Sequence, residues 1–127
     1  MKHILLLGTG GTIACKHGDS GLTPLLTGDE LLSYVPAARS FCEVEAIQVL
    51  NIDSTNIHPK HWQLLCQVLG DQTKAVFLGH LSKENNYEEL AYATVKLEID
   101  LGDTDYHADD FRIEVASREK LSPVIAF

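Results

Sequence analysis

A hydroxyl-bearing, glycine-rich segment is the first part of the sequence that could do chemistry. Gly8-Thr9-Gly10-Gly11-Thr12 directly follows a short apolar stretch. Glycines allow backbone N–H groups to approach a ligand closely, and such donors can stabilise an oxyanion. A threonine hydroxyl becomes a nucleophile once a base removes its proton. The segment therefore predicts a nucleophilic or ligand-binding turn, and a plain tight turn of small residues is the alternative.

A second polar cluster, Asp53-Ser54-Thr55-Asn56, follows the next apolar stretch that alternates like a strand. Its hydroxyl, carboxylate and amide groups suit a small polar ligand that carries both an amino and a carboxylate group. An Asx-type turn leading into a helix at Pro59 is the alternative interpretation. Ligands in open α/β sheets bind beyond the carboxyl ends of the strands. We therefore expect both clusters to lie at one edge of a sheet.

The elements that must position these clusters alternate between strands and helices. The sequence predicts strands at residues 2–7, 43–52, 75–78, 111–116 and 123–127, and helices at 30–35, from 59 to about 69, and at 87–99. Thr27 and Glu30 have the spacing of a capping box. Residues 15–26 predict a mobile loop, and residues 98–110, with six carboxylates, a solvated connection. This order predicts an α/β fold with a small, mostly parallel sheet flanked by helices, a Rossmann-like three-layer fragment.

Composition restricts the classes of partner. The net charge is −8, and an acidic surface repels nucleic-acid phosphates, so we expect no nucleic-acid partner. The apolar run at residues 4–7 is far shorter than the roughly 18–20 residues of a membrane span, so we expect no membrane partner. Three widely spaced cysteines favour a reduced, cytoplasmic location. Ile13 occupies the last glycine position of a dinucleotide motif, and no phosphate-loop lysine follows, so no cofactor is predicted.

Residues 1 to about 68 resemble the amino-terminal segment of bacterial L-asparaginases that use a threonine nucleophile. Four motifs carry the resemblance: GTGGTIA from Gly8, GLTP from Gly21, GDELL from Gly28, and DSTNI from Asp53 followed by Trp62. The resemblance implies that Thr12 is the nucleophile and that Asp53, Ser54 and Thr55 hold the substrate's α-amino and α-carboxylate groups. It also implies a small-molecule substrate, conversion of L-asparagine to L-aspartate and ammonia through an acyl-enzyme, and a homo-oligomer.

The sequence departs from that family at positions that matter for catalysis. Leu22 occupies the place of a loop tyrosine, and the third strand ends in Leu78-Gly79-His80-Leu81-Ser82 where the family has His-Gly-Thr-Asp-Thr. The second threonine and its aspartate are therefore missing, and we expect an amidohydrolase with impaired or absent catalysis. A non-catalytic module that binds aspartate-like ligands is the alternative.

Residues from about 74 to 127 resemble the carboxyl-terminal end of metallo-β-lactamase-fold hydrolases. The motifs are AVFLGHLSKENN from Ala75 and ELA from Glu89, and the resemblance makes His80 a metal-ligand position. One histidine cannot hold a catalytic metal, and His58 and His61 predict a surface pair, so no metal site is expected. A remnant of a metal-dependent hydrolase is the least favoured function. We expect segments 1–70 and 71–127, with the second completing the sheet of the first.

Overall fold

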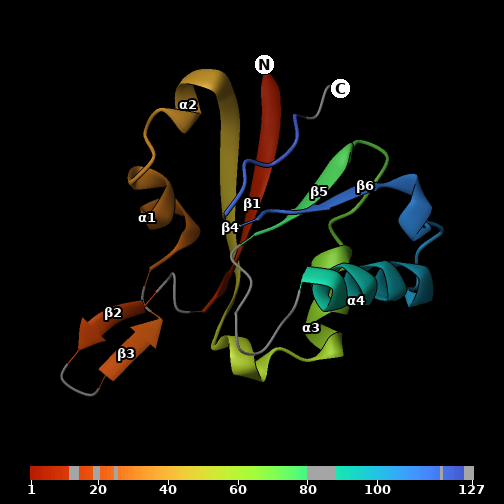
Figure 1. Ribbon diagram of the computed structural model, residues 1–127, viewed down its shortest axis with the longest axis horizontal. Helices are drawn as coiled ribbons and strands as arrows, with labels where there is room; N and C mark the ends of the chain where they lie inside the picture. Colours follow the sequence, from red (N-terminus) through yellow and green to blue (C-terminus); the bar gives the residue numbers. More distant parts are fainter. Residues whose placement is uncertain (12–14, 19–20, 25, 80–87, 118, 125–127) are drawn as a thin grey trace. The chain divides into compact units, whose positions relative to one another are not determined.

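The chain folds into two compact units, Met1–Ile57 and His58–Phe127 (Figure 1). The structure is a computed structural model that describes residues 1–11, 15–18, 21–24, 26–79, 88–117 and 119–124. Each unit combines short strands with helices, and each contains one pair of parallel strands. The predicted α/β class, with small parallel sheets flanked by helices, is confirmed. Within the described residues, no helix is long and apolar enough to cross a membrane.

The first unit is built on two parallel strands, β1 (Lys2–Gly10) and β4 (Cys42–Ile52). Their residues pair in regular register from Lys2 with Cys42 to Gly8 with Gln48. Both strands were predicted from apolar runs. β1 is longer than predicted, because its backbone stays extended through the glycines as far as Gly10.

Two short helices, α1 (Gly28–Ser33) and α2 (Ala38–Phe41), connect these strands. The capping box is confirmed: the Glu30 N–H donates to the Thr27 hydroxyl, and the Thr27 N–H donates to Glu30 Oε2 at 2.7 Å. Because Thr27 is the N-cap, α1 begins at Gly28 rather than at Glu30. The Gly28 N–H also donates to Gln48 Oε1 at 3.0 Å, which ties the start of α1 to β4.

Residues 15–26, predicted as a mobile loop, contain a β-hairpin. Strands β2 (Cys15–Gly18) and β3 (Gly21–Pro24) pair antiparallel, with Cys15 opposite Pro24 and Gly18 opposite Gly21. The prediction was wrong for these strands because backbone hydrogen bonds between two short segments need no alternation of apolar side chains.

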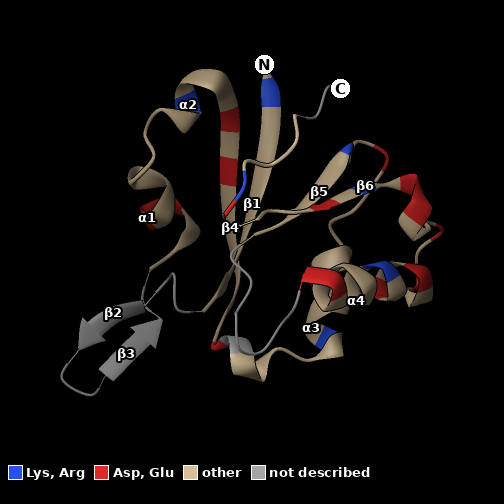
Figure 2. Cartoon of the chain, viewed as in Figure 1, with Lys and Arg blue, Asp and Glu red and all other residues tan. Residues whose placement is uncertain are grey.

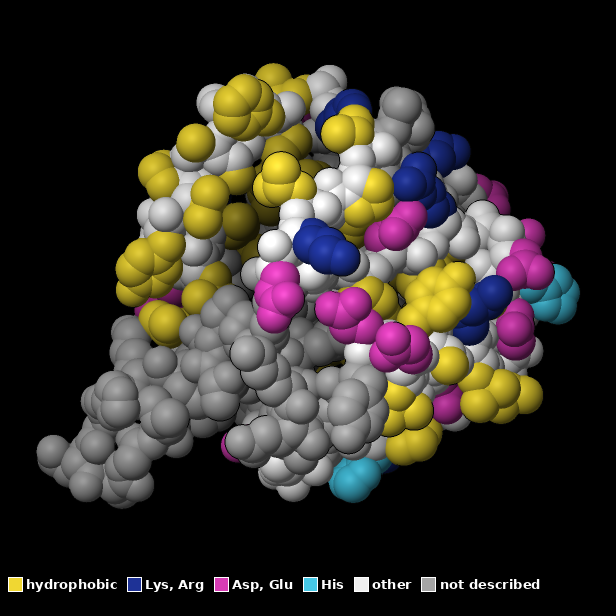
Figure 3. Space-filling model, viewed as in Figure 1, with side chains coloured by type: hydrophobic (Ala, Val, Ile, Leu, Met, Phe, Trp, Pro, Cys, Tyr) yellow, Lys and Arg dark blue, Asp and Glu magenta, His cyan; other side chains and the backbone are white. Residues whose placement is uncertain are grey.

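The first unit buries little apolar surface. In its described part, Gly28 is the one buried residue. Figure 3 shows apolar side chains gathered on its surface around α1 and α2, where Tyr34, Val35 and Phe41 are exposed. The arrangement of this unit therefore depends mainly on strand pairing and helix capping.

The second unit places helices α3 (Pro59–Cys66) and α4 (Glu88–Leu101) with strands β5 (Ala75–Leu78) and β6 (Arg112–Val115). β5 and β6 pair in parallel, with Ala75 opposite Arg112 and Leu78 opposite Val115, and α4 lies between them in the chain. These elements match the predicted ones closely. The buried apolar core consists of Leu78, Ala91, Val95, Ile99, Ala108, Phe111 and Ile113.

Two expectations for this unit differ from the structure in the described residues. The predicted solvated connection at 98–110 begins inside α4, where Glu98 is buried, and it ends in a 3-10 turn, Ala108–Asp110. Figure 2 shows that acidic residues occur along α4 and around this turn. Of the predicted last strand, 123–127, the two described residues, Pro123 and Val124, form no strand. The remaining positions, 125–127, lie outside the described residues.

Candidate functional site

The two polar clusters singled out from the sequence meet where β1 and β4 end. After a register shift beyond Gly8, Gly10 pairs with Ile52. The Gly11 N–H then donates to the Ile52 carbonyl oxygen at 2.9 Å. This hydrogen bond joins the glycine turn to the residue just before Asp53. The expectation that both clusters lie at one sheet edge holds for their described backbone.

The backbone at this junction requires glycine. Gly10 has φ +97° and Gly11 has φ +81°, a region that residues with a Cβ rarely adopt. A Cβ on Gly10 would stand 2.6 Å from both the backbone nitrogen and the carbonyl oxygen of Ile52. A Cβ on Gly11 would meet nothing within 4 Å. Gly10 is therefore needed both for its conformation and for close strand contact, whereas Gly11 is needed for its conformation.

Asp53 organises the polar loop. Its Oδ1 accepts hydrogen bonds from the Thr55 N–H and from the Thr55 hydroxyl, each at 3.0 Å. The Asn56 N–H donates to the Asp53 carbonyl oxygen at 2.9 Å, which closes a 3-10 turn at Ser54–Asn56. The loop is thus an Asx-type turn, as the structural alternative predicted. The side chains of Asp53, Thr55 and Asn56 are nevertheless exposed to solvent, where a ligand could reach them.

Two of the residues selected from the sequence lie outside the described residues, and a third is described in its backbone alone. Thr12 and His80 lie outside the described residues. Ser54 has its backbone in the 3-10 turn, but its side chain is outside the described part of the structure. Of the four predicted catalytic and substrate-binding residues, Asp53 and Thr55 are therefore the two whose side chains the structure describes.

The two histidines predicted as a surface pair lie at the start of α3. His58 is the N-cap and Pro59 is the first residue of the helix. The His58 N–H donates to Nδ1 of His61 at 2.9 Å, and the two rings stack with centroids 5.7 Å apart. Among the described residues, no three His, Cys, Asp or Glu side chains are grouped so that they could hold a metal ion.

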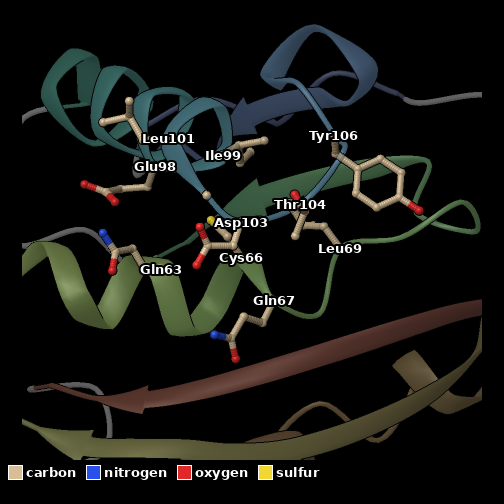
Figure 4. Close-up of a pocket in the computed structure, with 11 residues that line it drawn as sticks. Gln63, Cys66, Gln67, Leu69, Glu98, Ile99, Leu101, Asp103, Thr104 and Tyr106 are labelled. Carbon is tan, nitrogen blue, oxygen red and sulfur yellow. The ribbon is translucent and has the colours of Figure 1, made fainter.

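A pocket that sequence reasoning missed lies in the second unit. It has a volume of about 370 Å³ and lies between α3 and the carboxyl-terminal end of α4 (Figure 4). Glu98, which is only 6% exposed, lines it together with the half-buried Cys66. Burial, and then the nearby charge of Glu98, raise the pKa of the Cys66 thiol. The other lining residues are Gln63, Gln67, Leu69, Ile99, Leu101, Gly102, Asp103, Thr104 and Tyr106.

Helical spacing could have revealed Glu98. It follows Ala91 by seven residues and Val95 by three, so all three lie on one face of α4, and all three are buried. The acidic composition of residues 98–110 concealed this position. At the edge of the pocket, the Tyr106 hydroxyl donates to Asp71 Oδ1 at 2.7 Å. That hydrogen bond raises the pKa of Tyr106.

Two parallel strands of a small α/β protein end in a glycine turn and an Asx-type turn, at the kind of sheet edge where open α/β sheets bind ligands. Residues 3–80 match the family model described as "Asparaginase, N-terminal". The chain therefore belongs to the asparaginase family.

Individual relatives agree with this assignment. The chain is 30% identical, over 97 residues, to a subunit of the glutamyl-tRNA(Gln) amidotransferase of Methanococcus maripaludis, an alignment that covers 72% of this chain and 23% of the relative. It is 38% identical, over 60 residues, to the L-asparaginase of Thermococcus kodakarensis, covering 46% of this chain and 18% of that protein.

A solved structure of a probable cytoplasmic L-asparaginase from Campylobacter jejuni superposes with a TM-score of 0.58 at 28% identity. That match covers 74% of this chain and 31% of the other. The chain thus spans about a quarter of the length of the amidotransferase relative and under a third of the solved enzyme.

Proposed function

We propose that the chain carries the substrate-binding corner of an asparaginase-type amidohydrolase. In this proposal Asp53, Ser54 and Thr55 hold the α-amino and α-carboxylate groups of an asparagine-like amino acid. The Thr12 hydroxyl attacks the side-chain amide carbon, and the C–N bond breaks so that ammonia leaves. Water then hydrolyses the resulting ester to aspartate, which restores the hydroxyl.

The hydrogen bond from the Gly11 N–H to the Ile52 carbonyl oxygen is the observation that carries this proposal. It holds the backbone next to Thr12 against the backbone next to Asp53. A nucleophile and a substrate-anchoring loop must be this close for one small molecule to reach both. Membership of the asparaginase family supports the same roles for the matching residues.

The missing second threonine and aspartate support a weak or absent reaction. Where the family has His-Gly-Thr-Asp-Thr, this chain has Leu78-Gly79-His80-Leu81-Ser82. Removal of one member of a cooperative catalytic set commonly costs several orders of magnitude in rate. A module that binds aspartate without hydrolysing asparagine is therefore the second candidate. The exposed, pre-formed Asx turn favours this second candidate, because it needs no nucleophile to hold a ligand.

Ammonia release from L-asparagine, with L-glutamine as a parallel substrate, tests the hydrolytic reaction. We expect slow release by the wild type, loss of that release in Thr12→Ala, and retention in Thr9→Ala, the matched control on the other threonine of the turn. Release that is equal in the wild type and in Thr12→Ala would remove Thr12 from the proposal.

Binding of L-aspartate separates the two candidates. Amide resonances of Gly11, Thr55 and Asn56 are followed by NMR during titration with L-aspartate, with succinate as a control that lacks the amino group. We expect saturable shifts with L-aspartate alone, weakened by Ser54→Ala. Binding without ammonia release selects the binding module, and neither binding nor release overturns both candidates.

The segment boundaries, location and assembly state belong to the same proposal. We place an asparaginase-like segment at residues 1–70 and a metallo-β-lactamase-like segment at 71–127, with the second completing the sheet of the first. The three widely spaced cysteines support a cytoplasmic location, and the family resemblance supports a homo-oligomer. Elemental analysis for zinc and manganese tests a metal at His80, and sedimentation tests the oligomer.

A further inference from the structure

The pocket of the second unit contains a buried carboxylate that lacks a hydrogen-bond partner. Oε2 of Glu98 is fully buried, and no described group donates to it. Buried polar atoms in proteins are almost always hydrogen-bonded, and buried charges are paired. An exception that lines a pocket suggests that a ligand supplies the missing donor. We propose that this pocket binds the ammonium group of a small organic amine, with Glu98 as its counter-ion.

The charges around the pocket favour a cation. Glu98 and Asp103 both line it, and no lysine or arginine is among its described lining residues. Figure 4 shows the Glu98 carboxylate and the Gln63 carboxamide on the same side of the pocket, one from α4 and the other from α3. A carboxylate and an amide oxygen are two acceptors, which suits a group with several N–H donors such as a primary ammonium.

The other side chains that line the pocket favour an organic cation over a metal ion. A metal ion needs several ligands, and the described residues offer no group of three suitable side chains. Leu69, Ile99 and Leu101 instead supply apolar surface that a hydrated ion cannot use. The pocket's volume of about 370 Å³ lies near the lower end of small-molecule sites. The ligand class is therefore an amine with a short alkyl body.

The argument for this pocket does not rest on the proposed amidohydrolase corner. The lining residues that the structure describes belong to the unit His58–Phe127, whereas Asp53 and the glycine turn belong to Met1–Ile57. Failure of ammonia release or of aspartate binding would leave the amine pocket untouched, and the reverse is also true.

Titration of the 127-residue chain with n-butylammonium tests the proposal. Backbone amides of Gln63, Cys66 and Leu101 are followed by NMR, and butyrate and butanol serve as anionic and neutral probes of equal length. We expect saturable shifts with butylammonium, no shifts with butyrate, and weaker ones with butanol. Equal responses to all three probes, or no response to butylammonium, would overturn the proposal. Shifts that appear instead with magnesium, calcium or zinc chloride would also overturn it.

Two variants and a matched control complete the experiment. Glu98→Gln keeps the shape of the side chain and removes its charge, and we expect affinity to fall at least about tenfold, the range for losing a charged hydrogen bond. Asp103→Asn should weaken binding less and keeps the test valid if Glu98→Gln fails to fold. Glu89→Gln, on an exposed position of α4, should leave affinity unchanged. Unchanged affinity in both Glu98→Gln and Asp103→Asn would refute the assignment.

Discussion

Replacing Gly10 with alanine tests how the candidate corner is held together. Two costs coincide at this position: a φ of +97° that disfavours any Cβ, and a Cβ that would stand 2.6 Å from the nitrogen and oxygen of Ile52. Gly11→Ala is a matched control, because Gly11 has φ +81° but open space around its would-be Cβ. The two variants differ in the steric contact and share the conformational strain.

The expected magnitudes follow from these two costs. A non-glycine residue in a left-handed conformation costs about 1–3 kcal/mol, and the lower entropy of the unfolded alanine chain returns about 0.4–1 kcal/mol. Gly11→Ala should therefore lower the free energy of unfolding by about 1–2 kcal/mol. Gly10→Ala must also push the end of β1 from β4 and strain the Gly11–Ile52 hydrogen bond, which adds about 1 kcal/mol or more.

Native-state hydrogen exchange measures this difference. Amides of β1 and β4, from Lys2 to Gly8 and from Cys42 to Gln48, report the opening free energy of the paired strands. We expect Gly10→Ala to lower that free energy by at least about 1 kcal/mol more than Gly11→Ala does. Equal losses in the two variants would show that the close approach of Gly10 to Ile52 does not exist, and the reasoning that joins the two polar clusters would then fail.

Three further predictions concern helix capping, the core and the buried charge. Thr27→Ala removes the hydroxyl that accepts the Glu30 N–H, and it should destabilise the first unit by about 1 kcal/mol in the same exchange experiment. The Val95 side chain is only 3% exposed, and Val95→Ala should lower the free energy of unfolding of the second unit by about 1–3 kcal/mol. Leu97 is 54% exposed on the same helix, and Leu97→Ala should change that free energy by under about 0.5 kcal/mol. Burial, and then the nearby Glu98, raise the pKa of Cys66, so Glu98→Gln should lower that pKa. The thiolate fraction at a given alkaline pH should then rise, and iodoacetamide should alkylate Cys66 faster. An unchanged dependence of the alkylation rate on pH would contradict an electrostatic effect of Glu98 on the thiol.

The strands and the helix start around the candidate corner could be predicted because their signals are local. Thr27 and Glu30 define the start of α1 by their spacing, and apolar runs ending in Gly8 and Asp53 mark the two strands. Parallel strands bring their carboxyl ends to one sheet edge, so the meeting of the two clusters follows from topology. The shift in register before Gly10 has no such local signal, because it depends on the positive φ values that bring Gly11 to Ile52.

Two features could not be predicted from the sequence pattern, the β2–β3 hairpin and the burial of Glu98. The β2–β3 hairpin is held by backbone groups that every residue possesses, so its polar, glycine-containing sequence looked like a loop. For Glu98 the reason is different. Its spacing from Ala91 and Val95 was informative, but the acidic composition of residues 98–110 outweighed it in the prediction. Five other carboxylates within residues 98–110 made a solvated connection the natural interpretation. Position on a helical face determines burial more directly than the charge of the neighbours in sequence does. Glu98 lies on the same helical face as Ala91 and Val95, and this spacing predicts a buried carboxylate that needs a hydrogen-bond donor. The carboxylate oxygen that lacks a donor is the basis for the proposed amine pocket.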